Sequence, residues 1–153
     1  MSREIRPVAL DWEHPLAGGT YSDGRPRYVP LHSREDLRIH LDSFAADPED
    51  WDNEEPDPAD YMPEIPEGTP YGWQMYETVS EGSPVSPVCK TKDELAAWLS
   101  STAAGRNQVS PAAAAAFVDA GWAPTGMSLP GHGYMSGVAA SEFMNDAEGA
   151  ESR

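Results

Sequence analysis

Histidine, cysteine and serine are the residues of this 153-residue sequence whose types could support chemistry. Metal sites need several ligands at short, regular spacings. His14, His32, His40 and His132 form no HxxxH pair, and none stands near a cysteine in a recognised zinc motif. We therefore predict no metal site, and we expect each histidine to lie on the surface or in a loop.

Covalent catalysis also lacks its usual signatures. The sequence contains no GxSxG motif and no glycine-rich phosphate loop. Asp36 and His40 are four residues apart on a predicted helix, a spacing more typical of a helix-stabilising contact than of a catalytic pair. The single cysteine, Cys89, falls in a predicted strand, where a buried, inert thiol is expected. We predict no catalytic residue.

Carboxylates are too abundant to indicate an acid–base site by themselves. Glu77 and Glu81 flank a predicted hairpin turn and could in principle exchange protons with a ligand. In a chain with 26 Asp and Glu residues, however, solvated or hydrogen-bonded turn carboxylates are the more frequent outcome. We predict no cofactor, and the sequence favours a binding protein over an enzyme.

The charge of the chain restricts its partners. Lys and Arg number only ten, so the formal net charge is −16 and the pI is near 4.3. Binding to DNA or RNA requires clustered Lys and Arg, so this charge excludes the usual electrostatic route to nucleic acids and disfavours anionic membranes. A charged partner should instead be a protein with a basic surface.

The cysteine count and the hydropathy pattern indicate the compartment. One cysteine permits no internal disulfide, which fits a reducing environment. No apolar run approaches the length of a membrane span, and the first residues lack the apolar region of a signal peptide. We expect a soluble, intracellular protein.

The stretch 71–99 is organised as strand, turn, strand and helix. Residues 73–80 alternate between apolar and polar side chains, which predicts a half-buried strand. The turn that follows contains Gly82, which can adopt a positive φ. The return strand, 85–90, contains Pro87, which cannot donate to a ladder, so we expect it at a sheet edge.

Capping residues and the helical spacing of apolar side chains predict short helices. Thr91 and Glu94 form a capping box, Ser33 and Ser110 are candidate N-caps, and Gly121 supplies a stop after an alanine-rich segment. The predicted helices cover about 34–46, 92–100 and 111–120.

These elements predict an α+β fold. A small antiparallel sheet, built around the hairpin at about 73–90, is packed by two or three short helices. Long irregular acidic and Gly/Pro-rich segments separate these elements. We predict a single domain over 1–145 and a disordered tail over 146–153.

Residues 47–67 form a predicted acidic arm. Ten of these 21 residues are Asp or Glu, five are Pro and none is Lys or Arg. Trp51, Tyr61, Met62 and Ile65 are spaced through the arm, so we expect it to lie across the domain surface with its acids outward. The predicted acidic surface consists of Asp47, Glu49, Asp50, Asp52, Glu54, Glu55, Asp57 and Asp60.

Several blocks of the sequence carry a resemblance. They are SREIR and DWEHP near the N-terminus, DPADYMP in the middle, YETVSEGSPVSPV over 76–88, and GWAP and SGV near the C-terminus. Together they resemble a family of small acidic proteins encoded by tailed bacteriophages and prophages, and the resemblance covers most of the chain. It implies a phage context and the cytoplasm of a bacterial host, without a particular activity.

Three functions fit these expectations. The first is an accessory protein for host takeover that binds and modulates a host or anti-phage defence protein, for example as an anti-CRISPR or anti-restriction inhibitor. The alternative is a small enzyme or ligand-sequestering protein with a pocket at the hairpin and helix of 71–99. A further alternative is a minor virion or assembly protein. The candidate binding residues lie in the family-like motif and are Tyr76, Glu77, Ser80, Glu81, Ser83 and Ser86.

Overall fold

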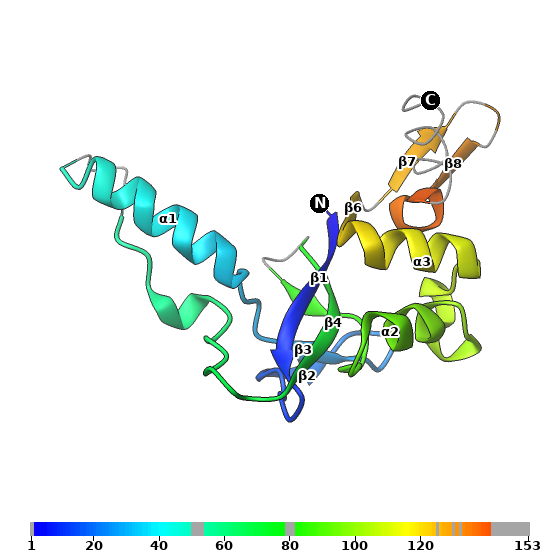
Figure 1. The fold of residues 1–153 in the computed structure, drawn as a ribbon, viewed down its shortest axis with the longest axis horizontal. Helices are drawn as coiled ribbons and strands as arrows, with labels where there is room; N and C mark the ends of the chain where they lie inside the picture. Colours follow the sequence, from blue (N-terminus) through cyan, green and yellow to red (C-terminus); the bar gives the residue numbers. More distant parts are fainter. Residues whose placement is uncertain are drawn as a thin grey trace.

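The computed structural model describes residues 2–49, 54–78, 82–124, 126–129, 131 and 133–141. The fold is α+β, as the sequence predicts. Its main sheet is antiparallel, in the order β5-β4-β1-β6, and Figure 1 labels β1, β4 and β6 of this sheet. The strands of this sheet are β1 (Ser2–Ala9), β4 (Tyr71–Glu77), β5 (Ser83–Pro84) and β6 (Trp122–Pro124).

Strand β1 lies inside the sheet although it contains Pro7. It pairs with β4 from Arg3 to Ala9 but with β6 only from Ser2 to Glu4. The amide of Ile5 donates to the carbonyl of Gly121 on the β6 side, so the nitrogen of Pro7, two residues later, points the same way. Because the β6 ladder has ended there, the missing N–H of Pro7 breaks no ladder bond.

Strand β4 is buried on both faces, so the expectation of a half-buried strand is wrong. Met75 is 1% exposed on one face and Tyr76 is 0% exposed on the other. The side chains do alternate between the two faces, as predicted. The polar side chains of Gln74 and Tyr76, however, also face a buried layer, where the Tyr76 hydroxyl donates a hydrogen bond to Gln74. Alternation alone cannot distinguish solvent from a polar interior.

The return strand is shorter than predicted and lies before the predicted range 85–90, because β5 covers Ser83–Pro84 alone. Only β5 pairs regularly with β4, and beyond it the chain touches β4 again at an isolated bridge between Trp73 and Cys89. Between these points the side-chain hydroxyl of Ser86 accepts a hydrogen bond from the amide of Met75 at 2.8 Å. This serine therefore replaces a ladder carbonyl in a segment that proline interrupts.

The predicted helices form with their predicted caps. Ser33, Thr91 and Ser110 each accept a hydrogen bond from an amide in the first helical turn, and Gly121 ends the last helix at φ 80°. In the predicted capping box, the carboxylate of Glu94 accepts a hydrogen bond from the amide of Lys90, the residue before Thr91. The α-helices are α1 (Arg34–Ala46), α2 (Lys92–Leu99) and α3 (Pro111–Ala120); the 3₁₀ turns are η1 (Pro58–Asp60) and η2 (Thr102–Asn107).

The core has one layer on each face of the main sheet. On one face α2 and α3 enclose Met75, Leu95, Leu99 and Phe117. On the other face a smaller cluster contains Val8, Leu31, Met62 and Tyr76. In Figure 1, α2 and α3 lie on one side of β1 and β4, with α1 on the other.

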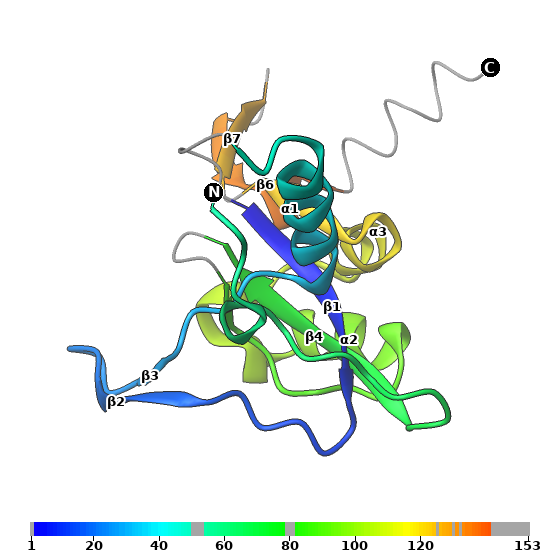
Figure 2. The ribbon, with the colours of Figure 1, turned by 90° about the vertical axis from the view of Figure 1, so that its left-hand side faces the viewer.

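Two small hairpins extend from this body. They are β2 (Leu16–Thr20) with β3 (Pro26–Tyr28) and β7 (Gly126–Leu129) with β8 (Gly133–Ser136). Figure 2 shows the β2–β3 hairpin reaching away from the main sheet. The predicted tail, 146–153, lies outside the described residues. In the described part of the chain, no helix has the length and apolar character needed to cross a membrane.

Helix α1 stands away from the sheet, and the arm returns from its far end towards β4 (Figure 1). Leu37 is the one described α1 side chain that is buried, whereas Ile39 is 49% exposed. In the arm, Tyr61 and Met62 are buried. These two side chains and Leu37 therefore attach a largely exposed helix–arm unit to the body.

Candidate functional site

Tyr76 is the centre of a buried polar cluster on the face of the main sheet that α1 overlooks. Its hydroxyl oxygen lies 3.1 Å from Nε1 of Trp12, 3.1 Å from Nδ1 of His14 and 2.9 Å from Oε1 of Gln74. Burial raises the pKa of Tyr76 to about 12, so the hydroxyl keeps its proton at neutral pH.

His14 lies in a loop, the irregular segment after β1, which is one of the two positions expected for it, but its side chain is buried, at 8% exposed. Its Nε2 lies 2.6 Å from the carbonyl oxygen of Val29 and donates to it, since a carbonyl only accepts. The ring packs edge-on against Trp12 and Tyr28, with centroids 5.8 and 5.5 Å away. His14 thus fixes two aromatic side chains.

Burial lowers the pKa of His14. Its hydrogen bond to the carbonyl of Val29 opposes this shift, and the nearby charge of Arg6 adds to it. A neutral ring with its proton on Nε2 leaves Nδ1 as an acceptor towards Tyr76.

Arg6 is a buried cation with a structural role. Its side chain is 4% exposed, and its guanidinium lies 4.4 Å from the ring centroid of Tyr76. It donates to the carbonyl of Leu31 at 2.7 Å and to the carboxylate of Glu4 at 2.7 and 2.9 Å. All three of its side-chain nitrogens therefore have protein partners.

A cleft of about 1080 Å³ lies between the β2–β3 hairpin and the segment from β5 to η2. We call it the hairpin–helix cleft. Three candidate residues line it, namely Glu77, Ser83 and Ser86. Other side chains that line it include Trp12, Tyr21, Tyr28, Gln74, Trp98 and Arg106.

The remaining candidate residues lie elsewhere. Tyr76 is fully buried behind the cleft and contacts Trp12 and Gln74, which line it. Ser80 and Glu81 lie outside the described residues. The motif therefore contributes three of the candidate residues to the wall of the cleft, and its Tyr76 holds two other wall residues from behind.

The polar groups of the candidate residues have structural partners. Glu77 is 26% exposed and pairs with Arg3 at 3.6 Å. The hydroxyl of Ser86 donates to the carbonyl of Pro87 at 2.9 Å while accepting from Met75. Both side chains therefore support the local structure, Glu77 through an ion pair and Ser86 through two hydrogen bonds to the backbone.

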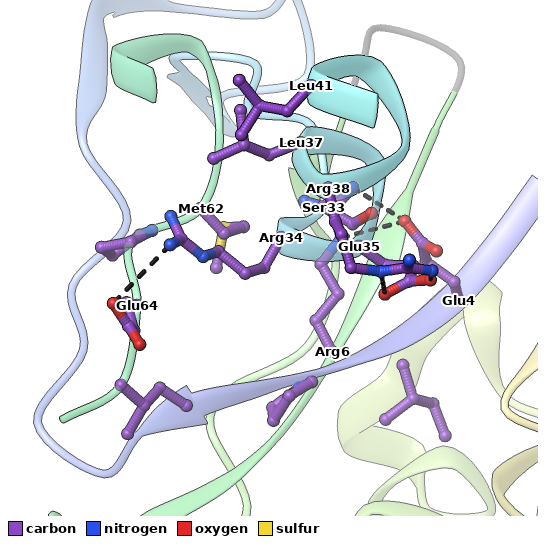
Figure 3. Close-up of a pocket in the computed structure, with 14 residues that line it drawn as sticks. Glu4, Arg6, Ser33, Arg34, Glu35, Leu37, Arg38, Leu41, Met62 and Glu64 are labelled. Atoms are coloured by element: carbon purple, nitrogen blue, oxygen red, sulfur yellow. Dashed lines mark hydrogen bonds and ion pairs between the residues drawn. The ribbon is translucent and has the colours of Figure 1, made fainter. Parts of the chain in front are cut away.

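A second cavity of about 690 Å³ lies between α1, β1 and the segment 62–65. We call it the α1 groove. Figure 3 shows Leu37, Leu41 and Met62 around this cavity, with Arg6 at its base. The apolar walls come from three separated parts of the chain.

The cations at the rim of the α1 groove are paired locally. Arg34 lies 3.6 Å from Glu64, and Arg38 pairs with Glu35 and, at 3.5 Å, with Asp42 (Figure 3 shows the first two pairs). These ion pairs are exposed, so each contributes little to stability. They do, however, neutralise the positive charges of α1, which are those of Arg34 and Arg38.

The predicted acidic surface is exposed where the structure describes it. Asp57 also accepts a hydrogen bond from the amide of Ala59 at 3.0 Å and so begins η1. Asp50 and Asp52 lie outside the described residues. The exposed members are Asp47, Glu49, Glu54, Glu55, Asp57 and Asp60.

Among the described residues, no three His, Cys, Asp or Glu side chains come together in a way that could hold a metal ion. Cys89 is buried, and desolvation raises the pKa of its thiol, with Glu94 adding to the shift.

No family model, curated protein or solved structure matches this chain. The functional interpretation therefore depends on the geometry of the cleft, the groove and the acidic surface.

No pattern along the chain indicates that the residues lining the hairpin–helix cleft lie close together. Arg25 and Arg106 come from segments 81 positions apart, and a single-sequence pattern does not report such proximity. Trp12 and His14 are two residues apart and so share one side of an extended segment, which could have indicated that both side chains reach the same site.

Proposed function

We propose that the protein is a non-enzymatic binding protein that docks on a basic surface of another protein through α1 and the acidic arm. The observation that carries this proposal is the distribution of charge. Residues 34–67 contain 13 of the 26 Asp and Glu residues but two of the ten Lys and Arg residues, which gives −11 of the total −16. Both arginines, Arg34 and Arg38, are engaged by local carboxylates.

The shape of the helix–arm unit supports the same role. Because α1 stands away from the sheet, its acids and those of the arm can approach a partner without obstruction by the body (Figure 1). Exposed Ile39 and Leu41 add apolar area among these charges. Charged rims mainly steer association, while apolar centres supply affinity, so the unit combines both elements of a docking surface.

The partner class follows from the resemblance to phage proteins. We propose a host or anti-phage defence protein, such as a CRISPR effector or a restriction enzyme, in the cytoplasm of a bacterial host. Such enzymes expose basic clefts for nucleic acid, and a projecting acidic unit is complementary to these clefts.

The test compares two variants of equal charge. The arm variant carries Glu49→Gln, Glu54→Gln, Glu55→Gln and Asp60→Asn. The body variant carries Asp11→Asn, Glu13→Gln, Asp93→Asn and Asp119→Asn, all at exposed positions. Wild type and both variants are used to capture proteins from a bacterial lysate, and captured partners are titrated at low and high salt.

We expect a salt-sensitive partner whose affinity for the arm variant is about tenfold or more below that for wild type, while the body variant stays within a few-fold. Equal weakening by both variants would show that total charge, and not the arm, determines binding. Absence of any salt-sensitive partner would contradict the proposal.

A second candidate function is the sequestering of a small ligand in the hairpin–helix cleft. Its size of about 1080 Å³ and its mixture of aromatic and polar side chains favour this candidate. It does not require the α1 groove or the arm.

A further inference from the structure

The hairpin–helix cleft collects positive charge in an acidic chain. Arg25 and Arg106 line it, Arg27 lies beside Tyr21 on the same hairpin, and Arg3 contacts Glu77 in its wall. These are four of only ten Lys and Arg residues. The carboxylates that line the cleft are Asp23, which pairs with Arg25 at 2.6 Å, and Glu77, which pairs with Arg3 at 3.6 Å. Arg27 and Arg106 therefore remain as the cations around the cleft that make no ion pair among the described residues.

Arg106 is the most available of these cations. It is exposed, and it makes no hydrogen bond or ion pair with its side chain in the part of the chain that the structure describes. Gly105 precedes it at φ 55°, and a Cβ there would meet nothing within 4 Å. The glycine is thus explained by backbone conformation, which presents Arg106 and Asn107 at the cleft.

Aromatic side chains form the rest of the wall. Trp12 is oriented by its hydrogen bond to Tyr76, and Tyr28 by its edge-on contact with His14. Tyr21 is 43% exposed, and the guanidinium of Arg25 lies 5.4 Å from its ring centroid. Fixed aromatic faces beside arginines provide stacking and anion binding in one place.

We propose that the hairpin–helix cleft binds a small aromatic anion of the nucleotide class, with its ring on the aromatic wall and its phosphate beside Arg25 and Arg106. Stacking on aromatic side chains is tolerant of the base, so the wall does not select one nucleobase. Arginine suits the phosphate because its planar donors can bind two oxygens at once.

The net charge of the protein limits the ligand to a small one. Arg27 and Arg106, which make no ion pair among the described residues, attract a compact anion at short range. A long polyanion would also meet the carboxylates that give the chain its charge of −16, and its binding is correspondingly weaker. The ligand is therefore a mononucleotide-like molecule and not a nucleic acid strand.

This inference rests on the ligand-sequestering candidate and is independent of docking by α1. Its test uses the intact protein and three probes: adenosine 5′-monophosphate, adenosine and inorganic phosphate. Binding is followed by calorimetry and by the fluorescence of the tryptophans, two of which, Trp12 and Trp98, line the cleft. The nucleotide is expected to bind about tenfold or more tightly than either fragment, because it uses both halves of the cleft.

Two variants distinguish the contribution of the arginines from that of the aromatic wall. Arg106→Gln is expected to weaken nucleotide binding about tenfold and to leave adenosine binding unchanged, whereas Tyr21→Ser weakens both. Arg38→Gln makes the same change on α1, far from the cleft, and should leave all three affinities unaltered. The circular dichroism and melting temperature of Arg106→Gln should match wild type, because this side chain makes no hydrogen bond or ion pair among the described residues and its charge acts on Asp23, which is exposed.

Each failure has a distinct meaning. Equal binding of nucleotide and adenosine, unchanged by Arg106→Gln, would overturn the anion site while leaving a ligand-sequestering cleft in place. Tighter binding of an oligonucleotide than of the mononucleotide would overturn the proposed ligand class. No binding of any probe at millimolar concentration would overturn the inference and leave the test of arm docking unaffected.

Discussion

The Nδ1 atom of His14 lies 3.1 Å from the hydroxyl oxygen of Tyr76. That hydroxyl has one proton and two acceptors within reach, His14 Nδ1 and Gln74 Oε1 at 2.9 Å. When His14 is neutral, one of these acceptors lacks a donor from Tyr76. A proton on Nδ1 would complete the chain from His14 through Tyr76 to Gln74, but at the cost of a buried charge near Arg6.

The first prediction concerns pH. Because the pKa of His14 is lowered by folding, the unfolded chain takes up a proton at higher pH than the folded one. The stabilisation from neutral His14 is complete above its unfolded pKa of about 6.5 and is lost as the pH falls below that value towards the lower folded pKa. Urea unfolding of wild type between pH 7.5 and 5 should show this decline.

His14→Gln should flatten that decline. At pH 7.5, His14→Gln should also lose about 1–3 kcal/mol of unfolding free energy, because Val29 and Tyr76 lose a buried partner. If the unfolding free energy of His14→Gln falls with pH as steeply as that of wild type, the pH dependence comes from other groups.

The second prediction concerns the hydroxyl of Tyr76. Tyr76→Phe keeps the ring under Arg6 but leaves Trp12, His14 and Gln74 without their shared partner. We expect a loss of about 1–3 kcal/mol in chemical denaturation. Tyr71→Phe, at a 53% exposed position on the same strand, serves as the control and should change little. Similar losses in the two variants would contradict a special role for this hydroxyl.

The third prediction concerns the close packing at Gly82. A Cβ at this position would lie 2.1 Å from the carbonyl oxygen of Leu31 and 2.6 Å from Nη2 of Arg6, at φ +132°. Gly82→Ala should therefore destabilise the protein by about 3 kcal/mol or more, through both strain and overpacking.

Gly68→Ala provides the matched control, because Gly68 has φ +83° and open space around it. Its cost should be about 1 kcal/mol, from backbone conformation alone. Thermal melts of the two variants measure the difference in stability. Equal melting temperatures would show that Arg6 and Leu31 can shift to accommodate the added methyl group.

The fourth prediction concerns the attachment of α1. Leu37→Ala removes the buried α1 side chain, and we expect α1 and the arm to open more easily by about 2–3 kcal/mol. Hydrogen exchange should rise in 34–46 and 54–67 and stay unchanged in α2 and α3. Ile39→Ala, at a 49% exposed position, should have no such effect. Uniform loss of protection would instead make α1 part of the main cooperative unit.

Local signals predicted the helices, and long-range contacts explain what was missed. The caps Ser33, Thr91 and Ser110 act within one turn, so sequence patterns reveal them. The burial of both faces of β4 depends on Trp12 and His14, more than 60 positions away, which no local pattern encodes. Likewise, Glu77, Ser83 and Ser86 could be selected from the motif, but Arg25 and Arg106 could not.

The position of β1 has a consequence for how the chain folds. Its residues are made before those of its neighbours β4 and β6, and Ser2 pairs with Pro124 and Arg3 with Glu77. The main sheet cannot close until most of the chain has left the ribosome, and loop closure over such separations slows folding. In the meantime the edges of β1 stay open to other strands, so a partly synthesised chain is more exposed to aggregation than the finished one.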